Sequence, residues 1–182
     1  MLKIIPILAL ALFCGFTTVH SQTGMKSKNL PNFFRVNDHL YRGGQPTKDG
    51  FMELKQLGVT TVINLRDNDD HARYEESLVV AAGLKFINMP LGNWDRPEVE
   101  EIDAIMSEID ILSNKPVFVH CKRGSDRTGT VMAVYRMTHD GWTGRRAKDE
   151  AKKFGIGWWQ HGMRDFIGDY YRDHIQKNAK HS

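Results

Sequence analysis

The stretch Pro116–Val134 reads PVFVHCKRGSDRTGTVMAV and decides the fold class of the chain. It begins with an apolar, β-branched run, Pro116–His120, which is typical of a buried strand. A run with helical character, Thr128–Thr138, follows and ends before Gly141. A strand that passes into a helix through a short loop is the repeating unit of α/β domains, so we expect this class of fold.

The same alternation of strand and helix patterns continues along the chain. We expect strands at 33–36, 39–42, 59–65 and 84–89, and helices at 47–57, 73–82, 98–112, 143–154 and 158–176. Together they predict a central, mainly parallel sheet of four to five strands flanked by helices. In such sheets ligands bind beyond the carboxyl ends of the strands, which places the loops 66–72, 90–97 and 121–127 at the functional edge.

The first residues, MLKIIPILALALFCGFTTVHSQTG, have the pattern of a secretory signal peptide. Lys3 precedes an apolar run over 4–16, and a small-x-small site follows at 19–21. The apolar run is shorter than the roughly 20 residues that span a bilayer, so a cleaved signal is the main hypothesis. A membrane anchor and a lipoprotein signal that ends at Cys14 are the alternatives.

Three parts are therefore expected: a signal peptide over 1–21, a flexible N-terminal arm over 22–32 and one domain over 33–182. The mature protein is predicted to be exported, either periplasmic or secreted, with no stable membrane insertion. The chain has 25 Lys and Arg against 22 Asp and Glu, and this small excess of positive charge predicts no nucleic-acid partner.

Cysteine usage singles out one residue. The chain has two cysteines, and Cys14 leaves with the signal peptide, so Cys121 is then alone. Exported domains use cysteines mainly in pairs, as disulfides. A single cysteine is therefore either a small buried apolar residue or a reactive thiol.

The loop around Cys121 favours the reactive thiol. A short loop with Gly124 that enters a helix can turn successive backbone N–H groups inward as an anion-binding nest. The start of the helix adds partial positive charge, and a thiol that faces such a nest ionises easily. The planar guanidinium of Arg127 can hold two phosphate oxygens at once. These features indicate a nucleophile for phosphoryl transfer.

The segment HCKRGSDRTG, residues 120–129, resembles the signature loop of the cysteine-dependent protein tyrosine phosphatases. The segments YRGGQP at 41–46 and INLR at 63–66 further resemble small atypical dual-specificity phosphatases of bacteria, plants and fungi. The resemblance covers 33–138 and implies a phosphate-binding loop between a strand and a helix. It also implies a phosphomonoester hydrolase that needs no metal and no cofactor.

The resemblance implies a role for each residue of this loop. The thiolate of Cys121 would attack phosphorus and form a phosphocysteine, while Arg127 stabilises the transferred group. Thr128 would donate a hydrogen bond to the sulfur, and His120 would support the loop from behind; purely structural roles are the alternatives for both. Substrate or phosphate binding is expected of Lys122, Arg123, Gly124, Ser125 and Asp126, although Asp126 is as well suited to bracing the loop.

The leaving group needs a proton, and Asp95 is the predicted general acid because it follows the strand at 84–89. Its spacing from Glu98 also matches a capping box, in which Asp95 would start the next helix. Asp67, Asp69 and Asp70 on the neighbouring loop are the second candidates for the acid.

The expected substrates are proteins that carry phosphotyrosine, phosphoserine or phosphothreonine. A phosphoinositide or inositol polyphosphate is the alternative, because Lys122 directly follows the cysteine, as in a branch of the resembled family that acts on phosphoinositides. Trp94 is a candidate for an aromatic wall of the site. Phe154, Trp158 and Trp159 are expected in the core or in a lid.

Two other classes of protein use a similar loop. A rhodanese-like sulfurtransferase has no need for Arg127 and Thr128, and a non-catalytic phosphate-binding module has no need for a nucleophile or an acid. The eight His residues are scattered without HxxxH spacing, and no CxxC exists, so no metal site is expected.

Overall fold

A five-stranded sheet lies at the centre of the structure, a computed structural model that describes residues 27–177. Its strands are β1 (Phe34–Arg35), β2 (Leu40–Gly43), β3 (Thr61–Asn64), β4 (Lys85–Asn88) and β5 (Val117–His120). The spatial order is β1-β2-β5-β3-β4, and only the β1–β2 pair is antiparallel. The predicted mainly parallel sheet is therefore confirmed.

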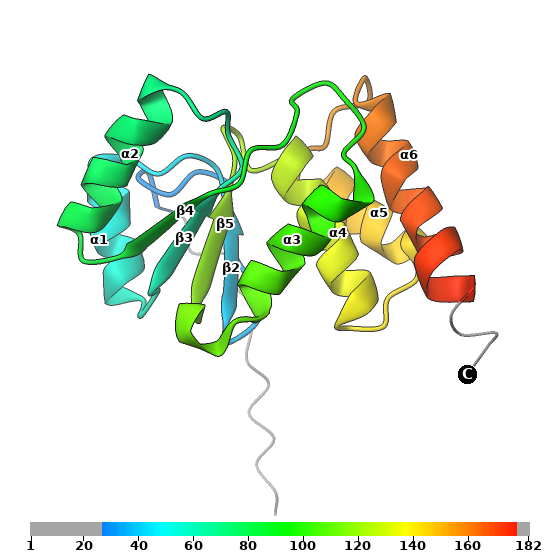
Figure 1. Cartoon of the computed structure of the whole chain (residues 1–182), viewed down its shortest axis with the longest axis horizontal. Coiled ribbons are helices and arrows are strands. Elements are labelled where there is room, and N and C mark those ends of the chain that lie inside the picture. The colour runs from blue at the N-terminus through cyan, green and yellow to red at the C-terminus, as the bar shows by residue number, and fades with distance from the viewer. Residues whose placement is uncertain (1–26, 178–182) are drawn as a thin grey trace, which may run out of the picture.

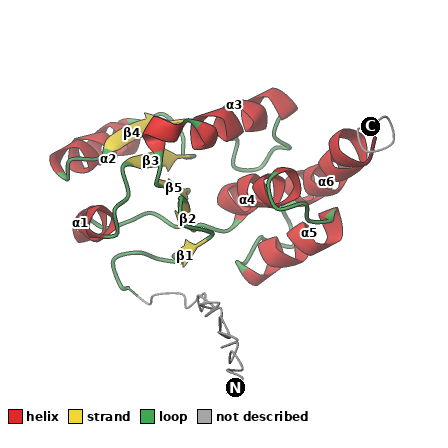
Figure 2. Cartoon of the chain, turned by 90° about the horizontal axis from the view of Figure 1, so that it is seen from below, coloured by secondary structure: helices red, strands yellow, loops and turns green. Residues whose placement is uncertain are grey.

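Six α-helices flank the sheet in the described part of the chain. They are α1 (Lys48–Gln56), α2 (Asp70–Ala81), α3 (Val99–Asp110), α4 (Asp126–Thr138), α5 (Gly144–Lys153) and α6 (His161–Tyr170). A 3-10 turn, η1 (Leu112–Asn114), precedes β5, and α6 continues into a π-helical stretch, η2 (Tyr171–Gln176). In Figure 1, α1 and α2 lie on one side of the strands and α3 to α6 on the other. Figure 2 shows α4, α5 and α6 grouped together.

The alternation of side chains along the strands divides the core into two parts. Val62 and Phe118 point toward α1 and α2, where they pack with Phe51. The neighbouring Ile63 and Val119 point the other way and pack with α3 to α6. Because α4 lies between the sheet and the other helices, every residue from Asp126 to Met137 is buried. The loop that leads from β5 into α4 is thus fixed at both ends.

Helix boundaries differ from expectation where polar residues set them. The helix expected at 73–82 begins at Asp70, because the side chain of Asp69 accepts a hydrogen bond from the N–H of Ala72 and caps it. The last helix begins at His161 rather than at Trp158, since the residues before it form a turn.

The predicted flexible arm at 22–32 is wrong for residues 27–32. Leu30 is only 2% exposed and belongs to the core beside α1. The carbonyl of Pro31 accepts a hydrogen bond from Gly44 N at 2.7 Å, and that of Asn29 accepts one from Thr47 N at 3.0 Å. This segment packs because its apolar residue and its backbone groups find partners in the domain. The predicted signal peptide at 1–21 lies outside the described residues.

No helix within 27–177 has both the length and the apolar composition needed to span a membrane.

Candidate active site

The loop after β5 turns its carbonyls outward and its amides inward. Lys122 O accepts from Gln45 N at 3.2 Å, and Gly124 O accepts from Arg42 Nη2 at 2.8 Å and from Asn32 Nδ2 at 3.1 Å. In a trans peptide the following N–H points away from the carbonyl, so the amides face the opposite side. Within residues 27–177, no backbone amide from 122 to 125 donates to a protein acceptor. This inward row of amides is a nest suited to an anion.

Gly124 is required for this shape. Its φ is +71°, a left-handed conformation that residues with a side chain rarely adopt. A Cβ at this position would lie 2.3 Å from Gly43 C and 2.5 Å from Gly44 N, both backbone atoms. Gly124 therefore lies closer to Gly43, the last residue of β2, and to Gly44 after it than any side chain allows.

Arg42 supports the loop from inside the protein. It is 1% exposed, and its guanidinium lies 3.8 Å from the ring centre of Phe154. Burial lowers the pKa of Arg42 to about 10, although Glu150 and Cys121 act in the opposite direction. The YRGGQP motif contained this residue, but the sequence did not reveal that its side chain binds the loop carbonyl of Gly124.

Cys121 lies at the base of the loop and is 3% exposed. Behind it, His120 Nε2 is 2.7 Å from Glu75 Oε1, and Asn64 Nδ2 donates to Glu75 Oε2 at 3.1 Å. The His120–Glu75 contact is close but not aligned as a hydrogen bond, and neither atom has another partner within 27–177. The other ring nitrogen, His120 Nδ1, lies 3.3 Å from Cys121 O, so the ring is held between Glu75 and the backbone of Cys121. No sequence pattern indicated Glu75, which belongs to α2 and is distant from the loop along the chain.

Arg127 is oriented by the ends of two strands. Its Nη1 donates to Leu65 O at 3.2 Å and to Leu91 O at 3.3 Å, just beyond β3 and β4. No acceptor among the described residues takes a hydrogen bond from its Nε or Nη2. The guanidinium is thus held by one nitrogen and keeps two nitrogens for an anion above the loop.

A cleft of about 290 Å³ opens above Cys121. It is lined by Asn93, Trp94, Cys121, Lys122, Arg123, Asp126, Arg127, Trp159 and Gln160. Five of these were predicted as site residues from the sequence. Trp94 is 69% exposed and Trp159 is 41% exposed, so both rings form the rim of the cleft.

The residues around Trp159 need separate comment. Of the two expected positions for Trp158 and Trp159, the core is excluded, because both are exposed, and Trp159 borders the cleft. Gln160 was not identified from the sequence, yet it is buried and its Nε2 donates to Asn93 O at 3.0 Å.

The two basic residues after Cys121 differ in their surroundings. Arg123 Nη2 pairs with Asp126 Oδ2 at 2.5 Å and lies 5.7 Å from the ring centre of Trp159. Asp126 Oδ1 accepts a hydrogen bond from Gly157 N at 2.8 Å, so both of its oxygens brace the loop. Lys122 is exposed and has no ion-pair partner in the described part of the chain. Lys122 is therefore the cation that remains available to a substrate.

Thr128 and Ser125 are buried in the same region. The hydroxyl of Thr128 has no hydrogen-bond partner within 27–177, so the predicted bond to the sulfur of Cys121 is not formed here. Ser125 precedes α4 without a side-chain capping bond. A buried hydroxyl without a partner is destabilising, and such groups call for an explanation in function.

Asp95 lies on the predicted loop but does not line the cleft. It is exposed, and its Oδ2 lies beside Gly92, 3.3 Å from where a Cβ of that residue would be. The alternative that Asp95 caps the next helix is wrong: α3 is capped by Glu98, which forms a capping box with Glu101. The loop is tied to α6, because Arg96 Nη1 pairs with Asp169 Oδ2 at 2.7 Å.

The structure separates the other three candidate acids. Asp69 caps α2, which lowers its pKa through the hydrogen bond from Ala72 N. Asp70 pairs with Arg73 on the surface. Only Asp67 approaches the site, with Oδ1 3.9 Å from Arg127 Nη1. It is thus the one competitor that remains to Asp95.

Comparisons with known proteins agree with this geometry. The family model described as "DSP-PTPase phosphatase fused to NAD+ Kinase" matches residues 9–158. The dual specificity protein phosphatase TpbA of Pseudomonas aeruginosa is 29% identical over 127 residues, which are 69% of this chain and 56% of TpbA. The inositol diphosphatase DSP5 of Arabidopsis thaliana is 29% identical over 144 residues, 77% of this chain and 70% of DSP5.

The chain thus spans little more than half the length of TpbA. A crystal structure of P. aeruginosa TpbA in complex with pTyr has a TM-score of 0.68 to this structure at 23% identity. The superposition covers 82% of this chain and 91% of the other, which shows a shared fold.

Proposed function

We propose that this chain, which belongs to the DSP-PTPase phosphatase family, hydrolyses phosphomonoesters through a phosphocysteine intermediate. One observation carries the proposal. Cys121 and Arg127 line the same cleft, at either end of a loop whose amides point inward. Such a loop binds three phosphate oxygens with fixed donors and needs no reorganisation when charge moves in the reaction.

In the first step, the thiolate of Cys121 attacks phosphorus. A sulfur–phosphorus bond forms, and the bond from phosphorus to the leaving oxygen breaks. The loop amides, together with Nε and Nη2 of Arg127, stabilise the charge on the oxygens of the transferred group. The leaving oxygen takes a proton from Asp95, whose carboxyl must turn from Gly92 toward the cleft for this purpose.

In the second step, a water molecule attacks the phosphocysteine and releases phosphate. The sulfur–phosphorus bond breaks, the thiolate of Cys121 leaves, and Asp95 takes the proton of the water. The hydroxyl of Thr128 would donate a hydrogen bond to the departing sulfur, a role that accounts for a buried hydroxyl without a partner. His120 and Glu75 would hold the base of the loop throughout.

Phosphorylated proteins are the first substrate class that we propose. TpbA is named as a dual specificity protein phosphatase, and its structure holds pTyr. In this chain, the exposed rings of Trp94 and Trp159 at the rim can contact an aromatic or aliphatic side chain that carries the phosphate.

A specific observation favours inositol phosphates as the second class. Lys122 lines the cleft without an ion-pair partner in the described residues, whereas Arg123 beside it is paired with Asp126. An unpaired cation beyond Arg127 suits a substrate that carries more than one phosphate. The relative DSP5 is named as an inositol diphosphatase.

We also propose that residues 1–21 are a signal peptide and that the mature protein acts outside the cytoplasm. The charged start, the apolar run and the small-x-small site support this proposal. N-terminal sequencing of the protein recovered from the periplasm or the medium tests it. A start at Gln22 is expected, and an intact Met1 in a cytoplasmic fraction would contradict it.

The test of activity is phosphate release in the presence of a chelator and a reductant. The panel holds a phosphotyrosine peptide, a phosphoserine peptide, phosphoinositides and inositol polyphosphates, with Cys121→Ser as the blank. Release from one class that Cys121→Ser abolishes supports the proposal and selects the substrate. Release that the variant leaves unchanged, or persulfide formation from thiosulfate without phosphate release, refutes it.

A further inference from the structure

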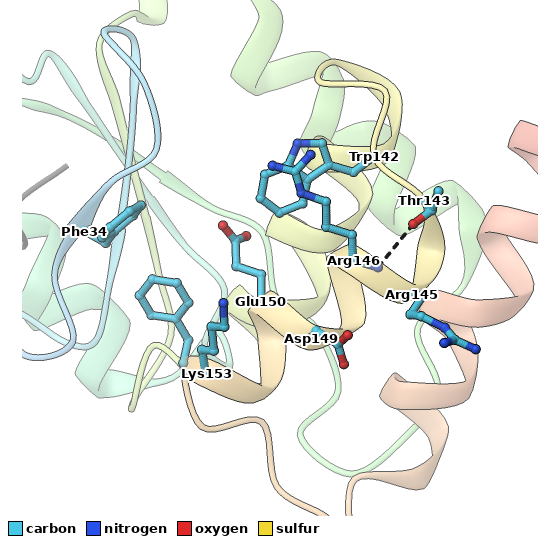
Figure 3. Close-up of a pocket in the computed structure, with 9 residues that line it drawn as sticks. Phe34, Trp142, Thr143, Arg145, Arg146, Asp149, Glu150 and Lys153 are labelled. Carbon is cyan, nitrogen blue, oxygen red and sulfur yellow. Dashed lines mark hydrogen bonds between the residues drawn. The ribbon is translucent and has the colours of Figure 1, made fainter. Parts of the chain in front are cut away.

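A second cavity, of about 600 Å³, lies between β1 and α5 and shares no residue with the cleft above Cys121. Its size falls in the range of about 300–1,000 Å³ that is typical of small-molecule sites. Figure 3 shows Arg146 along the ring of Trp142, with Glu150 and Lys153 of α5 between this pair and Phe34. The proposed catalytic reaction makes no use of this cavity.

Aromatic rings form two of its walls. The guanidinium of Arg146 lies 3.7 Å from the ring centre of Trp142, and Arg136 lies 4.6 Å from the same ring. On the other side, the rings of Phe34 and Phe154 meet edge to face with centres 5.2 Å apart. Walls of this kind suit a flat ring, which can stack on an aromatic face or on a guanidinium.

The charges in the cavity favour an anion. Arg145, Arg146 and Lys153 line it and have no ion-pair partner within the described residues 27–177. Of the acidic residues of the wall, Asp149 pairs with Lys152 at 2.9 Å, and Glu150 pairs with Arg136 at 3.0 Å, although Arg136 also pairs with Asp140. The cavity therefore presents three unpaired positive charges beside aromatic surface, more than the negative charge that remains on Glu150, and an anionic occupant would complement them.

We propose that this cavity binds a nucleotide-like ligand, that is, a flat heteroaromatic ring that carries a phosphate group. The ring stacks between the wall of Trp142 and that of Phe154, and the phosphate binds Arg146 and Lys153.

Phe154 links the cavity to the catalytic loop. Its ring lines the cavity and also lies under the guanidinium of Arg42, which holds Gly124 O. Its carbonyl accepts a hydrogen bond at 3.1 Å from Asn32 Nδ2, which also bonds to Gly124 O. A ligand that fixes Phe154 therefore fixes two of the contacts that keep the loop amides turned inward. Binding of the ligand accordingly raises the affinity of the catalytic loop for phosphate. By the same coupling, phosphate in the loop raises the affinity of the cavity for the ligand.

Calorimetric titration of the protein with cyclic AMP tests the site. Cyclic AMP carries a purine ring and one negative charge, and as a phosphodiester it is no substrate for a phosphomonoesterase. Arg146→Gln should weaken its binding about tenfold or more, the loss expected when one charge-assisted contact is removed. Lys148→Gln is the matched control, because Lys148 is on α5 but does not line the cavity.

The outcomes are distinct from those of the activity test, because binding needs no catalysis. Binding that Arg146→Gln weakens and Lys148→Gln leaves unchanged supports the site. Absence of binding at millimolar cyclic AMP, or an equal loss in both variants, overturns it. For the link through Phe154, saturating cyclic AMP should tighten the binding of inorganic phosphate at least fivefold, and an unchanged affinity for phosphate overturns the link.

Discussion

Replacement of Gly124 by Ala tests whether the catalytic loop depends on close contact with the backbone after β2. Two destabilising effects can be worked out from the structure. The left-handed conformation, with φ at +71°, costs about 1–2 kcal/mol once a Cβ is present. The clash of that Cβ with Gly43 C at 2.3 Å adds about 1–3 kcal/mol, because both sides are backbone and neither can rotate away.

A matched control separates these two effects. Gly141 has nearly the same conformation, with φ at +66°, but a Cβ there would meet no atom within 4 Å. Gly141→Ala should therefore lose only the conformational part, about 1–2 kcal/mol of the free energy of unfolding. Gly124→Ala should lower the free energy of unfolding by about 2–5 kcal/mol. Its Tm should fall by about 2–4 °C for each kcal/mol that is lost.

The assay is urea unfolding of the two variants and the parent protein under reducing conditions, together with phosphate release at a temperature where all three are folded. Gly124→Ala should lose nearly all activity, because the amides of the loop move with its backbone. Gly141→Ala should retain the activity of the parent. An equal loss of stability in the two variants would refute the reasoning from close contact, since only one of them introduces a clash.

Three further predictions follow from the site. Asp95→Asn should lower kcat at least about 100-fold toward a phosphotyrosine peptide, and Asp67→Asn less than about tenfold; the reverse order would make Asp67 the acid. Glu75→Gln should lower the free energy of unfolding by about 1–3 kcal/mol, because an amide has only one oxygen for the two buried groups, Asn64 and His120, that face the carboxyl of Glu75, and an unchanged midpoint in urea would contradict that role. Peroxide should inactivate the enzyme at Cys121, with early but not prolonged damage reversed by an added thiol; activity that survives peroxide would show that the thiolate is not required.

The parts of the site that the sequence predicted are those encoded within a few neighbouring residues. Cys121 and Arg127 belong to one short loop, and the strand before it and the helix after it have clear patterns of their own. Their shared cleft could therefore be predicted before any tertiary contact was known. The roles of Arg42 and Glu75 could not be predicted in this way, because they depend on contacts with residues far along the chain. Arg42, for example, donates a hydrogen bond to a carbonyl 82 residues away. Local patterns contain no information about such pairs.

The exposed positions of Trp158 and Trp159 have a physical cause of the same kind. Trp158 and Trp159 are large and apolar, which favours a buried position, but Gly155 has φ at +87° and Gly157 packs against the ring of Trp159. The backbone of this turn directs both rings outward. Residue composition alone cannot show whether a turn that contains two glycines directs its side chains into the core or into solvent.

The alternative role for Asp95 placed the capping box about one helical turn too early. The pairs Asp95 with Glu98 and Glu98 with Glu101 have the same spacing, and the structure uses the second pair to begin α3. Asp95 is thereby left outside the helix on an exposed loop. An aspartate that does not cap a helix is free to move, and a general acid on a loop must do so.

The segment after α5 connects the two loops that the proposed reaction needs. Gly157 N binds Asp126 beside the nucleophile, Gln160 binds the carbonyl of Asn93, and Asp169 pairs with Arg96 on either side of the predicted acid. The match to the family model ends at residue 158, so two of these three contacts involve residues beyond it. The nucleophile and its arginine therefore lie within the matched residues, whereas two of the contacts that hold the loop of the predicted acid are made by residues after them. Differences in substrate preference among proteins with the same loop can accordingly arise from this segment, without any change in the residues that bind phosphate.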